Sequence, residues 1–344
     1  MKKRIHQTKK QQTPTNLLKI TTILTTLLLT TIYLSGCTGQ QQNTIKISGA
    51  FALKPMMDKW VAEYNKIHPE ITIDVNANGA GQGMAEAKNK IVNIGMVSRE
   101  INRTEIEQGI FWVSVAKDAV VATINTDNPI INTILITGVT KQQLKHIFIT
   151  RTITTWGQLI GNNTITDPIT VYTRSDSCGA AETWALYLGN YKQNDLTNNA
   201  DAAVNGDNTL AATIQREQLG IGYNNIGYVY TKKIDNHSYV PADGIIPIPL
   251  DINENGVLDT NESFYQNRTT MVNAIVTNYY PSPPARALHL VTYKNFTGIT
   301  KDFVQWILTD GQQYVLESGY IPLSEETITT QLRYVNERTR PETL

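Results

Sequence analysis

The sequence predicts an α/β fold in two lobes, with largely parallel sheets. Segments in which apolar and polar residues alternate as in strands take turns, after residue 43, with segments whose apolar residues recur at helical spacing. The chain of 344 residues is also long for a single core, because domains of roughly 100–200 residues are typical. The sequence contains no internal repeat.

The first half of the pattern contains most of the clear elements. Thr140 is expected to cap the last of these helices, because its hydroxyl can accept a hydrogen bond from the first turn. The expected strands are residues 44–48, 71–75, 94–97 and 119–124, and the expected helices are residues 55–67, 83–91 and 141–148.

The later part of the pattern contains the elements of the second lobe and then the return of the chain to the first lobe. Strands are expected at residues 227–230, 245–250 and 287–291 and in the run from Ile169 that ends at Arg174. Helices are expected at residues 264–278 and 300–316, and a helical pattern includes Trp184, Leu186 and Leu188. The C-terminal block of helix, strand and helix is expected to complete the first lobe. The predicted boundaries are residues 44–125 and 263–344 for the first lobe and 126–262 for the second, with a cleft between the lobes lined by loops and helix starts.

The N-terminus predicts export. Six cations precede an apolar, threonine-rich segment at residues 20–34, which ends in Leu34–Ser35–Gly36–Cys37. This order resembles a lipoprotein signal peptide at residues 1–36, cut before Cys37 with lipid added to that thiol; the alternative is an uncleaved N-terminal anchor. Residues 37–43 then form a polar tether, and the rest of the chain lies outside the cell membrane.

Charge and cysteine content narrow the possible partners. Removing the six leader cations leaves 24 Lys and Arg against 30 Asp and Glu, a formal charge of −6, which argues against a nucleic-acid partner. The only cysteines are Cys37 and Cys178. If Cys37 is lipidated, the exported domain has no internal disulfide.

Residues 169–188 (ITVYTRSDSCGAAETWALYL) predict an anion site. A β-branched run ends at Arg174, and a turn of small residues leads into a helix. The free N–H groups and dipole of a helix start bind anions, and Arg174 adds a permanent planar cation. The alternative is an ordinary joint between strand and helix, with Ser or Asp as the N-cap.

A second glycine-rich helix start lies at residues 78–84 (NGAGQGM). Gly79, Gly81 and Gly83 permit a close approach of ligand to backbone. The spacing does not fit a dinucleotide fingerprint. Two such starts in separate halves of the chain favour an anion clamp with two sides.

These motifs together resemble the phosphate-binding proteins of ABC importers, specifically an archaeal branch. The segments that carry the resemblance are SGAFALKPMMDKWVAEYNKIHP, GAGQGMAEAKNKIVNIGMVSREI, RSDSCGAAETW, LGIGYNN and SPPARALHLV. The resemblance implies the type II periplasmic-binding-protein fold, with phosphate held between the lobes and delivered to a membrane permease.

The resemblance also implies ligand-binding residues. In order along the chain, the matching positions are Ala50, Phe51, Ala52, Gly81, Gln82, Gly83, Ser98, Arg99, Arg174, Cys178, Gly179 and Ala180. Where the family has Ser-Gly-Thr, this chain has Cys178–Gly179–Ala180, and several hydroxyl donors are missing. Backbone N–H groups would have to replace them, which leaves molybdate, tungstate and sulfate as rival ligands.

The family uses an acid to accept the proton of phosphate. Glu100, Asp176 and Glu182 are the candidates in this sequence. A sulfate receptor would avoid such a carboxylate, since an unpaired negative charge beside a dianion is unfavourable.

Residues 251–262 (DINENGVLDTNE) match the twelve-residue calcium loop. The ligand positions are Asp251, Asn253, Asn255, the carbonyl of Val257, Asp259 and Glu262, and Gly256 supplies the sharp turn. The preceding segment is strand-like rather than helical, so we expect a structural calcium site. The alternative is a surface turn rich in Asn and Asp.

The alternative class is a surface enzyme or adhesion module stabilised by calcium. An enzyme needs a nucleophile with a base, or a set of metal ligands, and none of the five histidines lies in a signature with Cys178. We therefore expect a monomeric receptor with no catalytic cofactor, which binds an oxyanion and docks on an ABC permease.

Overall fold

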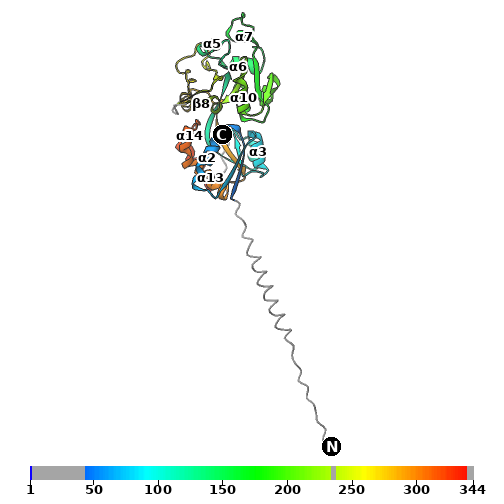
Figure 1. The fold of residues 1–344 in the computed structure, drawn as a ribbon, viewed down its shortest axis with the longest axis vertical. Coiled ribbons are helices and arrows are strands. Elements are labelled where there is room, and N and C mark those ends of the chain that lie inside the picture. The colour runs from blue at the N-terminus through cyan, green and yellow to red at the C-terminus, as the bar shows by residue number, and fades with distance from the viewer. Residues whose placement is uncertain (2–42, 234–237, 339–344) are drawn as a thin grey trace. The chain divides into compact units, whose positions relative to one another are not determined.

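The computed structural model describes Met1, residues 43–233 and residues 238–338 of the chain. Contacts divide the chain into two units, Met1–Asn43 and Thr44–Leu344. The predicted signal peptide, Cys37 and nearly all of the tether lie outside the described residues. The account below concerns the second unit (Figure 1).

Two hydrophobic cores define two lobes in this unit. One core contains buried residues from Ile45 to Ala116 and from Leu288 to Val335, and the other is drawn almost entirely from residues 119–285. Their helices are grouped accordingly, with α2, α3, α13 and α14 in the first lobe and α5, α6, α7 and α10 in the second (Figure 1).

The first lobe is built from both ends of the unit. Its elements are β1 (Thr44–Gly49), η1 (Phe51–Leu53), α2 (Lys54–Ile67), β2 (Thr72–Ala77), α3 (Ala80–Lys88), β3 (Ile94–Val97), α4 (Arg103–Glu107), β11 (Ala285–Tyr293), α13 (Gly298–Leu308), η2 (Asp310–Gln312), α14 (Gln313–Glu317) and α15 (Glu325–Glu337).

The second lobe takes the middle of the chain. Its elements are α5 (Ile131–Thr137), α6 (Lys141–Phe148), α7 (Trp156–Ile160), β5 (Thr170–Arg174), α8 (Gly179–Gly189), α9 (Gln193–Asn199), β6 (Ala202–Val204), α10 (Asp207–Ile214), β7 (Gly220–Asn225), α11 (Ile226–Val229), β8 (Tyr230–Lys232), β9 (Tyr239–Pro241), β10 (Ile246–Pro247) and α12 (Arg268–Val276).

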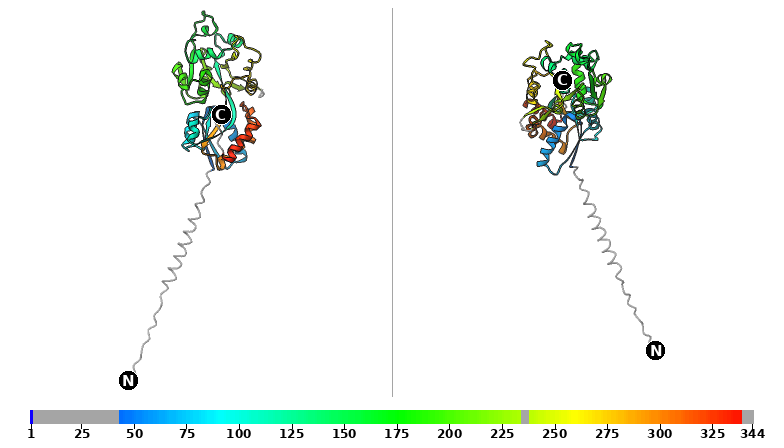
Figure 2. Two further views of the ribbon diagram at one scale, coloured as in Figure 1. Left: turned by 180° about the vertical axis from the view of Figure 1, so that it is seen from behind. Right: turned by 45° about the horizontal axis from the view of Figure 1, so that its top comes forward.

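One long strand, β4 (Ile110–Ile124), passes from the first lobe to the second (Figure 2, left). Its N-terminal part pairs with β11 and its C-terminal part with β7. The strand order β2-β1-β3-β11-β4-β7-β5-β6 therefore continues through both lobes. The chain crosses near residues 116–119 of β4 and again near residues 285–288 of β11, where membership of the two cores changes.

The α/β prediction is confirmed, but the prediction of largely parallel sheets is correct only for the outer strands. Strand β1 pairs in parallel with β2 and β3, and β5 with β6 and β7. The central pairs of β11 with β3, of β11 with β4 and of β4 with β7 are antiparallel. A strand that crosses between lobes meets a returning strand, so antiparallel pairing is favoured there.

The predicted lobe boundaries shift. The first crossing lies near residue 119 rather than 125. Helix α12 packs in the second core through Met271 and Ile275, so the return to the first lobe falls near residue 285 rather than 263. The segment was assigned wrongly because an amphipathic pattern identifies a buried face without naming the sheet that covers it.

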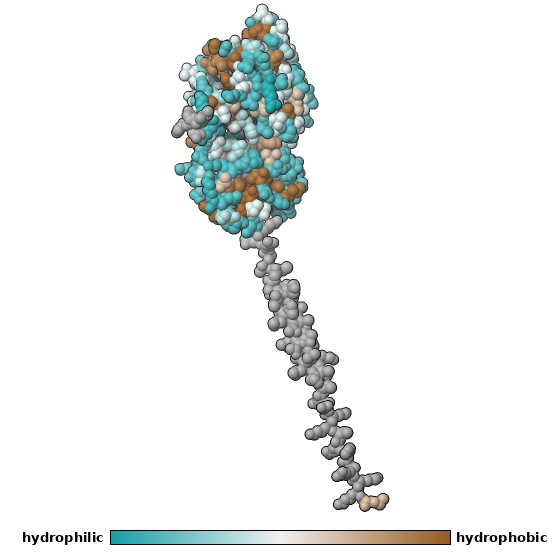
Figure 3. Space-filling view, viewed as in Figure 1, coloured by the Kyte–Doolittle hydropathy of each residue, from teal (hydrophilic) through white to brown (hydrophobic). Residues whose placement is uncertain are grey.

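Local predictions had mixed outcomes. Thr140 caps α6 with a reciprocal hydrogen bond from Gln143, as expected. The strand expected at residues 227–230 is mostly a helical turn, α11, and the single helix expected at residues 300–316 is divided into α13, η2 and α14. The face of this unit shown in Figure 3 is predominantly hydrophilic, with scattered apolar patches on both lobes.

Candidate functional site

The predicted ligand loops of the first lobe follow three parallel strands. Strand β1 leads into η1, β2 into α3, and β3 into residues 98–100. Since the carboxyl ends of parallel strands lie at one edge of a sheet, these loops are placed together. The β5–α8 turn of the second lobe meets them, because Gly81 N donates to the Ser177 carbonyl over 3.3 Å.

The start of η1 presents backbone donors. The Tyr228 hydroxyl donates to the Phe51 carbonyl at 2.9 Å, and the Tyr320 hydroxyl donates to the Ala52 carbonyl at 2.7 Å. In a trans peptide the N–H points away from the preceding carbonyl, so the Ala52 N–H points away from Tyr228. Within the described residues the N–H groups of Phe51 and Ala52 have no partner, whereas Ala50 N donates to Met96 at 2.9 Å.

The α3 start is shaped by close packing. A Cβ on Gly81 would lie 2.0 Å from Ser177 Oγ, and one on Gly83 would lie 2.5 Å from the Cα of Gly49. The side chain of Gln82 donates to Glu86 at 2.8 Å, so its amide is engaged within the first lobe. The backbone N–H of Gln82 has no partner within the described residues and remains a candidate donor.

Arg99 joins the two lobes. It makes two hydrogen bonds to Glu105, at 2.7 and 2.9 Å, and its Nε lies 2.9 Å from Glu182 Oε2 on α8. Burial lowers the pKa of the Arg99 guanidinium, but Glu105 and Glu182 outweigh this effect and raise it. Its charge is therefore already matched by carboxylates.

Arg174 is also matched. Its side chain is 1% exposed and makes hydrogen bonds of 2.8 and 2.6 Å to the two oxygens of Asp176. Its Nη1 lies 2.7 Å from Asp207 Oδ1, and its guanidinium lies 5.3 Å from the centre of the Phe51 ring. Burial lowers the pKa of Arg174, and the attraction of Asp207 contributes most to raising it well above its ordinary value.

The sequence prediction of a free cation at Arg174 is thus incomplete. One guanidinium faces two carboxylates, and burial raises the pKa of Asp207. Asp207 was missed, although it stands directly after Gly206 at the start of α10, which is a recognisable helix-start signal. An anion bound here would be held mainly by dipolar N–H groups rather than by net positive charge.

Cys178 caps α8 instead of Ser or Asp. Its Sγ accepts from Ala181 N at 3.4 Å, and its own N–H donates to Gln193 at 3.1 Å. A helix start would favour the thiolate in principle, yet burial raises the pKa of Cys178 to about 12. The thiol therefore remains protonated, and Cys178 is a structural cap whose own N–H is already engaged by Gln193.

Gly179 and Ala180 begin α8 with N–H groups that have no partner within the described residues. A Cβ on Gly179 would lie 2.4 Å from both the carbonyl and hydroxyl oxygens of Ser98, so α8 abuts the first lobe there. These two donors join those of Phe51, Ala52 and Gln82 in a group drawn from both lobes.

The three candidate proton acceptors differ in their contacts. Both carboxylate oxygens of Asp176 accept hydrogen bonds from the Arg174 guanidinium, and Oδ1 also accepts one from Gly206 N at 3.1 Å. Glu182 pairs with Arg99, and burial raises its pKa. Glu100 forms no ion pair with a described residue and, together with Glu182, lines a neighbouring cavity.

The predicted calcium loop folds on itself through hydrogen bonds. Asp251 accepts from Asn255 N and Gly256 N at 3.1 and 2.8 Å, and Glu262 Oε1 accepts from Ile252 N at 2.8 Å. Gly256 has φ of +83°, as the turn requires. No group of three His, Cys, Asp or Glu side chains in the described part of the chain is arranged to hold a metal ion.

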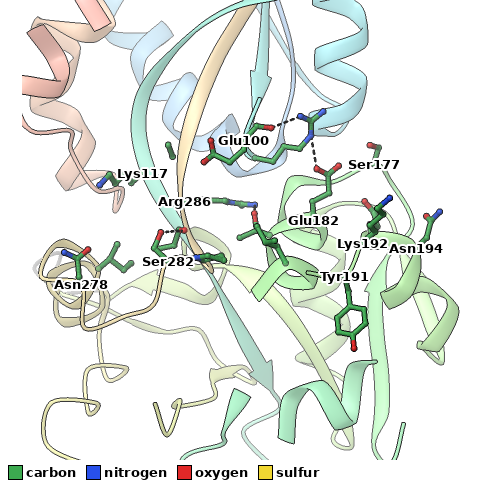
Figure 4. Close-up of a pocket in the computed structure, with 18 of the residues that line it drawn as sticks. Glu100, Lys117, Ser177, Glu182, Tyr191, Lys192, Asn194, Asn278, Ser282 and Arg286 are labelled. Carbon is green, nitrogen blue, oxygen red and sulfur yellow. Dashed lines mark hydrogen bonds and ion pairs between the residues drawn. The ribbon is translucent and has the colours of Figure 1, made fainter. Parts of the chain in front are cut away.

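A cavity of about 1060 Å³ lies beside the helix starts. Among the predicted site residues only Arg99 lines it, and its walls include Glu100, Glu182 and Arg286 (Figure 4). The cavity therefore adjoins the helix starts, since Ser175 and Ser177 of the β5–α8 turn also line it. In the described residues no helix is long and apolar enough to cross a membrane.

The fold consists of two lobes joined by crossing strands. Comparison of the chain with known protein families identifies the class of protein to which this fold belongs. A family model described as a PBP superfamily domain matches residues 37–311. The chain therefore belongs to the PBP superfamily.

Several proteins with similar sequences are named as phosphate-binding proteins. The chain is 25% identical over 294 residues to phosphate-binding protein PstS of Pseudomonas aeruginosa, covering 80% of this chain and 81% of that protein. It is 23% identical to PstS of Methanocaldococcus jannaschii, covering 90% and 93%. Among solved structures, a putative phosphate ABC transporter substrate-binding protein with bound phosphate from Clostridium perfringens gives a TM-score of 0.65 at 24% identity, covering 82% of this chain and all of that one.

Proposed function

We propose that this chain is the extracytoplasmic substrate-binding component of an ABC importer and that it binds inorganic phosphate between its lobes. The observation that carries the proposal is a set of N–H groups at the starts of η1, α3 and α8, which come from both lobes and have no partner among the described residues. Helix starts of this kind bind anions. The names of the relatives point to phosphate as that anion.

The charges around the turns favour a protonated oxyanion. Arg174 is paired with Asp176 and Asp207, so carboxylates lie close to the proposed ligand. A carboxylate can accept the proton of monohydrogen phosphate, whereas sulfate carries no proton at neutral pH and would meet only repulsion. Molybdate and tungstate remain the alternative ligands, and an enzyme is disfavoured because the Cys178 thiol stays protonated.

Calorimetry of the purified protein against phosphate, sulfate, molybdate and tungstate tests the ligand. Phosphate should bind more tightly than the other three. Ala180→Pro removes one N–H in the first helical turn, where proline is tolerated, and should weaken phosphate binding by about tenfold or more. Glu326→Pro places proline at the same position of α15, away from the cleft, and should leave binding unchanged. Equal affinities for Ala180→Pro and the unmodified protein would reject the assignment of α8.

The cellular setting is part of the proposal. Lipid on Cys37 would hold the receptor at the outer face of the membrane, and residues 38–43 would give it reach to the permease. When phosphate binds, the two lobes of the monomeric receptor would close around it, and the closed receptor would present both lobes to the permease together. Labelling with a radioactive lipid precursor, lost in Cys37→Ala, tests the anchor.

The loop at residues 251–262 is proposed as a structural calcium site. It is supported by the twelve-residue pattern and by the burial of Asp251 and Glu262, which are 2% and 3% exposed and form no ion pair with any described residue. Calcium should raise the melting temperature and EDTA should lower it, because a ligand of the native state stabilises that state. Glu262→Gln should abolish the response. Identical melting with and without EDTA would make the loop an ordinary turn.

A further inference from the structure

The large cavity beside the helix starts is lined by none of the five residues whose N–H groups are proposed to bind phosphate. Its volume of about 1060 Å³ is at the upper end of small-molecule sites, and far exceeds what a tetrahedral oxyanion needs. It lies between the α8 face and the crossing segment of β11, with walls from both lobes.

The charges of the cavity are arranged along its length. Figure 4 shows Lys117 at one end and Lys192 at the other, with Arg286 and Glu182 between them. Arg99 and Arg286 have carboxylate partners, at 2.9 Å from Glu182 and 3.4 Å from Asp118. By contrast, neither lysine forms an ion pair among the residues that the structure describes.

The middle of the cavity is suited to an organic body. Leu186 is 43% exposed there, and Ile275 and Ala285 also line the wall. Arg286 is buried at the floor, and its guanidinium donates to Thr183 Oγ1 at 3.2 Å. Its Nε has no hydrogen-bond partner in the described residues. Glu100 is the one lining carboxylate without an ion pair there.

We propose that this cavity is a second ligand site, which binds an elongated organic dianion such as an aliphatic dicarboxylate. Its two anionic groups meet Lys117 and Lys192, and its carbon chain lies against Leu186. An ion with a charge at each end uses both unpaired lysines, whereas a single small anion would leave the apolar wall and one lysine without a contact.

Calorimetry of the full chain at saturating phosphate tests the site. Adipate should bind. Hexanoate has the same length but only one charge, and its affinity should be lower by at least about fivefold. Lys117→Gln and Lys192→Gln should each weaken adipate binding by about fivefold and remove the preference over hexanoate. Lys232→Gln, which removes an exposed lysine of β8, is the matched control and should change nothing.

Three outcomes would overturn the proposal. These are no binding of any dicarboxylate from succinate to suberate, an equal loss of binding in Lys232→Gln, and adipate binding that weakens as phosphate is added. The last outcome would place the dicarboxylate at the helix starts instead. Phosphate affinity is measured on the same variants without adipate and should be unchanged, so failure of this site is distinguished from failure of the phosphate proposal.

Discussion

The substitution Gly179→Ala should weaken phosphate binding, which requires the lobes to close, without destabilising the fold. Gly179 is the first residue of α8 and does not have a positive φ, so alanine fits the backbone. Its Cβ would however lie 2.4 Å from two oxygen atoms of Ser98 in the first lobe. A Cβ does not approach closer than about 3.0 Å, so Ser98 would have to retreat by about 0.6 Å.

Gly179→Ala is expected to have opposite effects on the free energy of unfolding and on the free energy of phosphate binding. Alanine in place of glycine stabilises a helix by up to about 1 kcal/mol, so the free energy of unfolding of the ligand-free protein should not fall. A displacement of about 0.6 Å between the lobes should cost at least one charge-assisted hydrogen bond to the anion. Such a bond contributes roughly 1.5–3 kcal/mol, which corresponds to a loss of about 10- to 150-fold in phosphate affinity.

Calorimetry, thermal melting and X-ray scattering together measure the effect. Phosphate should reduce the radius of gyration of the unmodified protein and change that of Gly179→Ala much less. Gly227→Ala is the matched control, because its Cβ would meet only the Tyr320 hydroxyl at 3.8 Å, an ordinary contact. Unchanged phosphate affinity in Gly179→Ala would refute the contact between Gly179 and Ser98 as a feature of the bound state.

Two further predictions concern buried charges. Burial raises the pKa of Asp118 to about 6 from its ordinary 3.8, although Arg286 opposes the shift. The native state therefore keeps a proton that the unfolded state releases, and Asp118 lowers stability as the pH rises from about 4 to about 6, by at most about 3 kcal/mol. Urea unfolding across this range should show a shallower fall in Asp118→Asn, and parallel curves would contradict the shift. Arg174→Ala leaves Asp176 and Asp207 buried without their cation, so it should cost about 3–5 kcal/mol of stability, and the two unpaired carboxylates should repel phosphate and weaken its binding. An unchanged urea midpoint would show that this ion cluster does not stabilise the fold.

Helix starts and strand positions were largely predictable from the sequence. The cap at Thr140, the glycine-rich start of α3 and the turn between β5 and α8 all have local causes, such as a hydroxyl, a missing Cβ or a run of small residues. The order of these motifs also carried the resemblance to phosphate-binding proteins, and that resemblance implied the two-lobed fold.

Charge balance and lobe membership were decided only by the tertiary structure. Arg174 reads as a free cation in the sequence, yet folding brings Asp207 to it from 33 positions along the chain. Arg99 likewise meets Glu182 across the lobes. Local patterns report which face of an element is buried, but not what lies against it, and electrostatic pairing depends on distance in space. The same reason explains Cys178, whose helix position favours the thiolate while the surrounding core holds it as a thiol.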